Sequence, residues 1–404
     1  MTSRPERWPR SQDRAPILAQ LRQWKMARSA HAYLRGNAGK FYHWLDSDSG
    51  LAVPQGPGIW ICGDCHLGNL GPMANAKGRV DVQIRDLDQS VIGNPAHDLI
   101  RLGLSLATAA RGSDLPGVTT ARMVEQLIEG YRHALVGRFR MRPTTLPETV
   151  QAAMRDSHRR TWKNLATERI EDTRPTIPLG KHFWPLSKQE RSEMQKLFET
   201  DPVRCLVTSL HSRDDNAPIR LLDAAFWVKG CSSLGRLRFS ALVQVGKSHK
   251  DAELCLIDLK EAVKAAAPRH KRAVMPRDNG RRVVEGARHL APFLGDRMLS
   301  TRFLGHSVFL RELRPQDLKL EIDQLSREEA MVAARFLAGV VGKAHARQLD
   351  AQNRRKWAAE LTRNRSKELD APQWLWDSIV ELASIHEAAY LQHCRRYAAD
   401  RIAA

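Results

Sequence analysis

Apolar and polar residues alternate most regularly in the middle of the chain. From residue 237 to 245 every second residue is apolar, and the runs 220–228, 254–261 and 307–314 are also rich in branched or aromatic side chains. A period of two is typical of a β-strand with one buried face. Polar or glycine-containing turns separate the runs. The pattern predicts a β-rich region over residues 203–315.

On both sides of this region the apolar spacing is closer to the helical repeat of 3.6 residues. These helical patterns cover residues 17–42, 99–107, 119–140 and 328–347, and one further helical pattern, residues 281–289, lies within the β-rich region. We therefore predict a helical part in two pieces, residues 16–200 and 326–404, on either side of the strands. Residues 1–15 are polar and rich in Pro and Arg, and are predicted to form a mobile tail.

Two short apolar runs in the first quarter of the chain lead into polar side chains. Residues 59–62 are followed by Asp64 and Asn69, and a second run is followed by Asp86 and Asp88. Carboxylate and amide oxygens suit Mg²⁺ bound to a phosphate, with one carboxylate left over as a base. The alternative is that these side chains only cap turns.

Three motifs in this segment follow one another in a characteristic order. They are Gly63-Asp64-x-His66-x-Gly68-Asn69, Ile84-x-Asp86 and Gly93-Asn-Pro-x-x-Asp98. Together they resemble the catalytic core of aminoglycoside-phosphotransferase-type, kinase-like enzymes. Over about residues 26–349 the chain resembles more closely DUF2252, a bacterial family of uncharacterised kinase-like proteins. The further motifs that carry this resemblance are Tyr33-Leu34-Arg35-Gly36, Arg85-Asp86-Leu87-Asp88, a glycine loop and Lys260-Glu261-Ala262.

The resemblance implies an α+β, two-lobed protein-kinase-like (aminoglycoside-phosphotransferase-like) fold. A β-rich small lobe would bind the nucleotide, and a mainly helical large lobe would carry the catalytic and metal-binding loops. Residues 328–347 resemble the helix that precedes the catalytic loop in such enzymes, but here that helix lies far downstream of the loop. We therefore expect the fold to be circularly permuted.

The resemblance also implies roles for individual residues of the first lobe. Asp64 would orient or deprotonate an acceptor hydroxyl group. Asn69 and Asp86 would bind Mg²⁺, with Asp88 as a second carboxylate ligand. Asp98, at the start of a buried helix, is expected to be a helix N-cap and an anchor for the loop.

A glycine-bounded turn, Lys229-Gly-Cys-Ser-Ser-Leu-Gly235, lies between two predicted strands. Gly230, Ser232, Ser233 and Gly235 would bring backbone N–H groups close to the phosphates of a nucleotide. Ser232 stands where the usual G-x-G-x-x-G pattern has its middle glycine. The alternative is a plain hairpin turn.

Lys260 follows this turn at the end of a predicted strand. By resemblance it would contact the α- and β-phosphates and pair with Glu285 on the next helix. Glu261 competes with Glu285 for that pairing. The alternative is that Lys260 is an exposed lysine at a strand end.

The 404-residue chain has a net charge of +19 and a pI near 10.1. This charge favours acidic partners such as nucleotides, nucleic acid, an anionic membrane surface or phosphorylated substrates, unless it is only a solvated surface. No nucleic-acid fold signature is present and aromatic residues make up 6% of the chain, so nucleic acid is not the favoured partner.

Cys62-Gly-Asp-Cys65-His66 also matches the C-x-x-C-H sequence that attaches haem, and C-x-x-C occurs in zinc and redox sites. Haem attachment requires export, but no apolar leader or membrane span is evident, and no second cysteine pair has zinc-site spacing. We expect no haem, a cytoplasmic location, and a structural hydrogen-bonding role for His66.

These observations predict ATP- and Mg²⁺-dependent transfer of a phosphoryl group to a hydroxyl of an unknown acceptor. The positive charge of the chain is compatible with an acidic acceptor. Nucleotidyl transfer by the same groups stays open. The alternatives from other classes are a nucleotide-binding pseudokinase that acts as an interaction module and a basic, nucleic-acid-associated protein.

Overall fold

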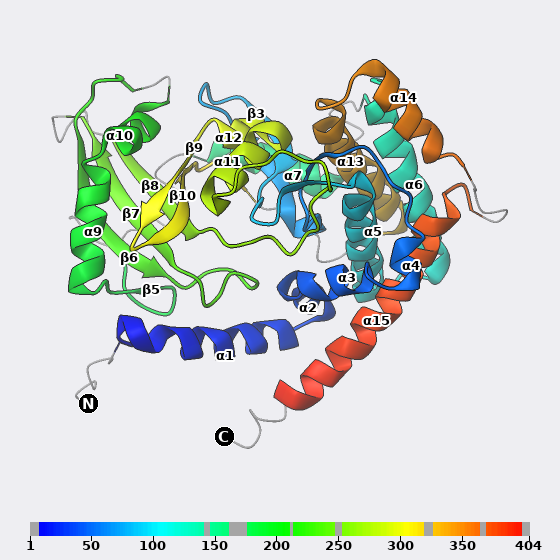
Figure 1. Ribbon diagram of the computed structural model, residues 1–404, viewed down its shortest axis with the longest axis horizontal. Coiled ribbons are helices and arrows are strands. Elements are labelled where there is room, and N and C mark those ends of the chain that lie inside the picture. The colour runs from blue at the N-terminus through cyan, green and yellow to red at the C-terminus, as the bar shows by residue number, and fades with distance from the viewer. Residues whose placement is uncertain are drawn as a thin grey trace.

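In the computed structural model of the chain, a six-stranded antiparallel sheet occupies one end of the molecule (Figure 1). The structure describes residues 8–140, 146–160, 176–210, 213–246, 253–318, 326–363 and 369–397. In spatial order the strands are β5 Phe183–Trp184, β6 Ile219–Trp227, β7 Arg238–Val245, β8 Glu253–Glu261, β10 His306–Leu313 and β9 Met298–Phe303. The four central strands confirm the predicted strands, whereas the edge strands β5 and β9 were not predicted.

The two faces of the sheet differ because side chains alternate along each strand. One face is apolar and packs against α9 (Lys188–Phe198) and α10 (Asp201–Thr208). The other face carries charged side chains of β7, β8 and β10, which are described below. Strand β5, helix α9 and the start of α10 pack with this sheet, although they precede residue 203 in the sequence.

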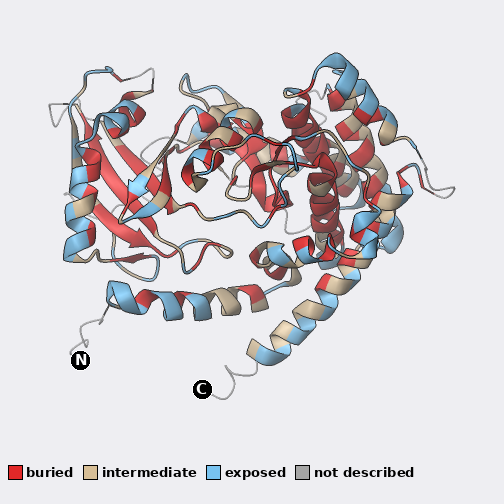
Figure 2. Cartoon of the chain, in the orientation of Figure 1, coloured by how far each residue is buried: buried red, intermediate tan, exposed pale blue. Residues whose placement is uncertain are grey.

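The helical part surrounds the largest hydrophobic core of the molecule, and Figure 2 shows that α5 and α13 are buried along most of their length. Its main helices are α5 Pro95–Gly112, α6 Gly117–Leu135, α13 Arg327–Ala346, α14 Ala351–Glu360 and α15 Gln373–Tyr397. Helices α6 and α13 approach very closely at Gly130, where a Cβ atom would overlap with the carbonyl oxygen of Arg335. The two flanking segments of the sequence thus form one core.

Two small ribbons lie between the sheet and the helices. Strand β1 (Ile59–Ile61) pairs with β4 (Val91–Gly93), and β2 (Leu70–Ala74) pairs with β3 (Val80–Ile84), both antiparallel. The short helix η2 (Leu67–Asn69) leads into β2. The loops that connect these strands contain the predicted catalytic and metal-binding motifs.

The N-terminal segment connects the two ends of the molecule. After η1 (Ser11–Asp13), α1 (Arg14–Ala27) runs along the lower side in Figure 1, from the sheet towards α2 (Ala30–Gly36) and α15. The chain then continues through α3 (Ala38–Trp44) and α4 (Asp48–Leu51). Helical structure therefore begins within the predicted tail, of which residues 1–7 lie outside the described part.

The remaining elements are α7 (Glu148–Arg159), α11 (Asn279–Leu290) and α12 (Pro292–Gly295). The chain is thus a mixed α and β protein with one larger sheet. Within the described ranges, no helix combines the length and the apolar character needed to cross a membrane.

Candidate functional site

Asp98 holds the loop that follows β1. Its carboxylate accepts hydrogen bonds from the backbone N–H groups of Cys62 at 2.7 Å and Gly63 at 2.9 Å. Asp98 is therefore a loop anchor, as predicted, but it is not the N-cap of α5. That position belongs to Asn94, whose side chain accepts from the N–H of Ala96, with Pro95 as the first helical residue.

The same carboxylate also reaches the C-terminal part of the chain. His345 Nε2 on α13 lies 3.2 Å from Asp98 Oδ2, and the Nδ1 atom of this histidine lies 2.8 Å from the hydroxyl of Tyr131. Trp357 donates to that hydroxyl from α14 at 3.1 Å. This buried network ties the loop to both halves of the helical part, and sequence reasoning had not assigned a role to His345 or Tyr131.

Asp64 lies one residue beyond the anchored backbone. Its carboxylate forms an ion pair with the fully buried guanidinium of Arg101 on α5. The side-chain amide of Asn69 donates to the Asp64 carbonyl at 2.8 Å, which fixes the amide plane. Burial raises the pKa of Asp64, and Arg101 offsets this effect only in part.

His66 lies beside this pair, with Nε2 3.9 Å from Asp64 Oδ2. Burial and the positive charge of Arg35 lower the pKa of His66 well below its ordinary value, so the ring is neutral at pH 7. His66 is therefore not a cation that stabilises Asp64.

Lys260 bridges the two carboxylates at the end of β3. Its ammonium group contacts Asp88 Oδ2 and lies 3.5 Å from Asp86 Oδ1, while its side chain is only 6% exposed. The structure thus brings together residues that are more than 170 positions apart in the sequence. The alternative of an exposed strand-end lysine is wrong.

The two carboxylates differ in their environment. Burial and the negative charge of Asp86 raise the pKa of Asp88 to about 6, although Lys260 opposes this shift. For Asp86, partial burial opposes ionisation, but Lys260 and two arginines beyond it lower the pKa below its ordinary value. Asp88 Oδ1 is buried and has no hydrogen-bond partner within the described residues.

Lys260 shares the charged face of the sheet with a buried ion-pair cluster. Asp258, on the same face of β8, is fully buried and accepts two hydrogen bonds from Arg238 at 2.9 and 2.6 Å and one from Arg311 at 3.1 Å. This fixes two guanidinium groups beside Asp86. The strand alternation could have identified Asp258, because it places residues 258 and 260 on one face.

The glycine-bounded turn lies against the N-terminal helices. Gly230 and Gly235 have φ values of +101° and +96°, which favour glycine. A Cβ atom at Gly230 would overlap with the buried Ser233 hydroxyl, whereas Ser232 is half-buried. Lys25 of α1 donates to the carbonyl oxygen of Gly230 at 3.0 Å.

A cavity of about 400 Å³ lies where these parts meet. It is lined by Asn69 and Asp86 from the helical part, by Gly230 and Cys231 from the turn, and by seven cationic side chains. These are Lys25, Arg28, Arg35, Arg85, Lys229, Arg238 and Arg311. We call it the cationic cavity. Sequence reasoning missed the contribution of α1 and α2, because no local pattern indicates that these helices pack beside the turn.

Glu285 does not pair with Lys260. Its carboxylate lies 3.6 Å from Arg288 and 3.7 Å from His289 on its own helix, α11. The inward face of α11 instead carries Arg282, which donates to the carbonyl oxygens of Asp88 at 3.0 Å and Val263 at 2.9 Å. The prediction was wrong because the helix turns residue 285 towards solvent.

Glu261 does not replace Glu285 at Lys260. Its carboxylate accepts from the backbone N–H of Leu237 at 2.9 Å and lies 3.1 Å from His306 Nδ1. The carboxylates that the structure brings to Lys260 are therefore those of Asp86 and Asp88.

Cys62 and Cys65 of the C-x-x-C-H sequence lie in the protein interior. All six cysteines, each within the described residues, are free, and Cys62 and Cys65 are buried. A side-chain hydrogen bond with Cys65, together with burial, raises the pKa of Cys62 well above its ordinary value. In the described ranges, no group of three His, Cys, Asp or Glu side chains is placed to hold a metal ion. A metal ion beside Lys260 would have to be bound by Asp86, Asp88, the Asn69 amide and oxygen atoms of the ligand itself.

The model of one protein family matches residues 14–396, nearly the whole chain; its description is "Uncharacterized protein conserved in bacteria (DUF2252)". The chain belongs to the DUF2252 family. This match includes α1 and α15 as well as the motif loops, so the N-terminal helices beside the cationic cavity are part of the DUF2252 region. No curated protein and no solved structure matches the chain.

Proposed function

We propose that this DUF2252 protein is a phosphotransferase with a circularly permuted, protein-kinase-like fold, which transfers a phosphoryl group from Mg²⁺-bound ATP to a hydroxyl group. One observation carries the proposal. Asn69 and Asp86 from the helical part and Gly230 from the sheet part line one cavity, and Lys260 joins Asp86 to Asp88 at its edge.

The donor set fits Mg²⁺. Asp86 and Asp88 contribute carboxylate oxygens, and Asp88 Oδ1 is a buried oxygen without a partner among the described residues. The Asn69 amide nitrogen is engaged with Asp64, which leaves the amide oxygen for a cation. Mg²⁺ in nucleotide sites is held by one or two carboxylates together with phosphate oxygens and water, so three protein ligands suffice. The ion would neutralise charge on the phosphates.

The cationic cavity suits the phosphates themselves. Phosphoryl transfer is catalysed mainly by positioning and by charge stabilisation. Guanidinium groups bind phosphate oxygens in a bidentate manner, and Arg238 and Arg311 are held in place by Asp258. The turn around Gly230 contributes backbone N–H groups, and Lys260 contacts the α- and β-phosphates. Asp64, held by Arg101, orients the acceptor hydroxyl.

The proposal is tested by calorimetric titration of the full chain with Mg²⁺-ATP. Asp86→Ala is expected to weaken binding at least tenfold, since it removes a metal ligand. Asp81→Ala is the matched control, because Asp81 is an exposed aspartate on β3, the strand that leads to Asp86. Equal binding by wild type and Asp86→Ala, or no binding by wild type, would contradict the proposal.

A pseudokinase is the second candidate, because Asp64 is paired with Arg101 and Glu285 is turned away from Lys260. It predicts ATP binding without turnover. Release of labelled phosphate from γ-labelled ATP by wild type, lost in Asp64→Asn while ATP binding persists, supports the phosphotransferase.

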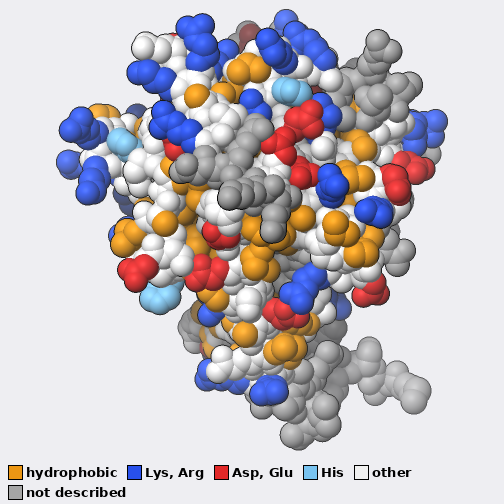
Figure 3. Space-filling model, turned by 90° about the vertical axis from the view of Figure 1, so that its right-hand side faces the viewer, with side chains coloured by type: hydrophobic (Ala, Val, Ile, Leu, Met, Phe, Trp, Pro, Cys, Tyr) orange, Lys and Arg blue, Asp and Glu red, His pale blue; other side chains and the backbone are white. Residues whose placement is uncertain are grey.

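Nucleic-acid binding is less well supported by the charge distribution. On the face shown in Figure 3, Lys and Arg side chains are interspersed with Asp, Glu and apolar groups and form no continuous stripe. Seven cations instead line one cavity. A cytoplasmic location is part of the proposal, since ATP is abundant there and the six cysteines are free.

A further inference from the structure

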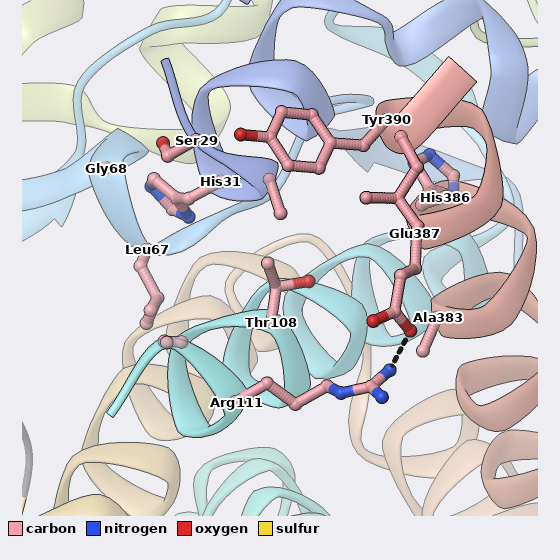
Figure 4. Close-up of a pocket in the computed structure, with 14 residues that line it drawn as sticks. Ser29, His31, Leu67, Gly68, Thr108, Arg111, Ala383, His386, Glu387 and Tyr390 are labelled. Carbon is pink, nitrogen blue, oxygen red and sulfur yellow. Dashed lines mark hydrogen bonds and ion pairs between the residues drawn. The ribbon is translucent and has the colours of Figure 1, made fainter. Parts of the chain in front are cut away.

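A second cavity, of about 470 Å³, lies between α5 and α15. Figure 4 shows Thr108 and Arg111 of α5 on one side, α15 on another, and His31 with the Leu67-Gly68 segment on a third. We call it the helical cavity. Its volume is within the range of about 300–1,000 Å³ that is usual for small-molecule sites.

The helical cavity borders the cationic cavity. Gly68 lines both of them. A Cβ atom at this glycine would lie 3.3 Å from Arg35 Cζ, and equally close to His66 Cε1. His66 in turn lies beside the Asp64 carboxylate. A molecule in the helical cavity would therefore lie next to the loop that carries Asp64.

The two cavities differ in charge. The helical cavity is lined largely by apolar groups, including Leu67, Ala109 and Ala383. Its charged residues, Arg111 and Glu387, form an ion pair with each other, which is marked in Figure 4. Unlike the cationic cavity, it therefore offers an anion no net attraction.

His386 is a buried polar residue of the lining. His386 on α15 is 5% exposed, and its Nδ1–H donates to the carbonyl oxygen of Leu382 at 3.0 Å. Its Nε2 atom therefore carries a lone pair and has no hydrogen-bond partner among the described residues. Burial, together with Arg101, lowers the pKa of His386 to about 4, so the ring stays neutral at pH 7. His386 therefore adds no charge to the lining of the helical cavity.

We propose that the helical cavity binds the acceptor of the phosphoryl transfer, and that this acceptor is an uncharged alcohol with an apolar body. The inference rests on the function proposed above. The acceptor oxygen forms a bond to the γ-phosphorus, the bond from that phosphorus to the β,γ-bridging oxygen breaks, and ADP leaves with the electron pair. The hydroxyl proton passes to the Asp64 carboxylate. The net positive charge of the chain was compatible with an acidic acceptor, but the lining of the helical cavity does not favour one.

The test measures binding of two probes of the same shape, 4-phenyl-1-butanol and 4-phenylbutyrate, to the full chain by calorimetry. The alcohol is expected to bind saturably, and the carboxylate at least tenfold more weakly. Ala383→Trp, which fills the cavity, should weaken alcohol binding at least tenfold. Ala388→Trp is the matched control, because Ala388 is an exposed residue of the same helix outside the lining.

Equal binding of the two probes, no alcohol binding, or unchanged alcohol binding by Ala383→Trp would overturn the inference.

Titrating Mg²⁺-ATP into the same variants separates this inference from the proposed function. Both tryptophan variants should bind the nucleotide as wild type does. If ATP binds and the alcohol does not, the inference about the acceptor fails alone. If the alcohol binds and ATP does not, the proposed phosphotransferase fails, and the acceptor role fails with it.

Discussion

Asp98 and Asp88 are two carboxylates of the motif segment, and their surroundings differ. Asp98 is fully buried and contacts two backbone N–H groups and His345. Asp88 contacts Lys260, and its other oxygen has no partner among the described residues. Its neighbour Asp86 keeps a side chain that is 45% exposed and lines the cationic cavity.

The difference indicates which carboxylate is structural and which can bind a ligand. A buried polar group is stable in a fold when its hydrogen bonds are made, as they are for Asp98. A buried oxygen without a partner destabilises the fold by about 1–3 kcal/mol unless a ligand or ion supplies one. The sequence motifs alone do not separate structural from ligand-binding carboxylates, because Asp64, Asp86, Asp88 and Asp98 all belong to them.

The largest effect on stability is expected from Asp98→Ala. The change leaves two backbone N–H groups and His345 without their common partner, so the free energy of unfolding should fall by roughly 3–5 kcal/mol. Chemical denaturation of the full chain measures this. A loss below about 1 kcal/mol would contradict the structural role of this carboxylate.

Gly230→Ala should destabilise the chain by about 1–2 kcal/mol through backbone strain alone, and by more because its Cβ atom overlaps with Ser233. Gly235→Ala is the matched control, since its φ is also positive but no atom lies within 4 Å of the added Cβ. Denaturation midpoints of the two variants separate strain from overlap. Equal losses of stability in the two variants would show that the Ser233 side chain moves away from the added Cβ atom without destabilising the fold.

The pH dependence follows from the raised pKa of Asp88, about 6 in the fold against 3.8 for an ordinary aspartate. The folded chain holds a proton that the unfolded chain has released, so this residue's contribution to the stability of the ligand-free fold is lost as pH rises from 3.8 to about 6. Mg²⁺ requires the ionised carboxylate, so Mg²⁺-ATP binding should instead strengthen about tenfold per pH unit below that pKa.

Titrations between about pH 5 and pH 7 check this, with Asp88→Asn as the comparison. The pH dependence of Mg²⁺-ATP binding should be much flatter in that variant. An equally steep dependence in Asp88→Asn would assign the titrating group to another residue.

The smallest effect is expected from Glu285→Gln. Among the described residues this carboxylate forms ion pairs with Arg288 and His289 of its own helix, and such surface pairs contribute roughly 0–1 kcal/mol. Mg²⁺-ATP binding and stability should therefore both stay close to those of wild type. A tenfold loss of nucleotide affinity would show that Glu285 moves to Lys260 when the ligand binds.

The sequence predicted those parts of the fold that depend on local patterns. Alternation identified β7, and runs of branched or aromatic residues identified β6, β8 and β10. The period of two in a strand could also have assigned Asp258 to the face of Lys260. The helix that contains Glu285 was also predicted, but its rotation about its axis depends on packing against Ser90, which no local pattern encodes. The sequence Asn94-Pro95 is typical of a helix start and could have identified Asn94, rather than Asp98, as the N-cap of α5.

The site was less predictable than the fold. The motifs identified the carboxylates, but Lys25, Arg28 and Arg35 join them only because α1 crosses from the sheet to α15. Edge strand β9 was missed because its turn to β10 uses Leu304 and Gly305, both with positive φ, and leucine is an unusual residue there. Contacts of this kind between distant segments require the tertiary structure.

The most direct test compares thermal melting of wild type, Asp86→Asn and Asp98→Asn, each with and without Mg²⁺-ATP. At about 100 times its dissociation constant a ligand stabilises a fold by roughly 2.7 kcal/mol. We predict that Asp86→Asn melts like wild type without ligand but loses this stabilisation, whereas Asp98→Asn melts at a lower temperature and keeps it. The reverse pattern, or stabilisation of both variants to the same extent, would contradict the assignment of the Asp86, Asp88 and Lys260 group as the nucleotide site.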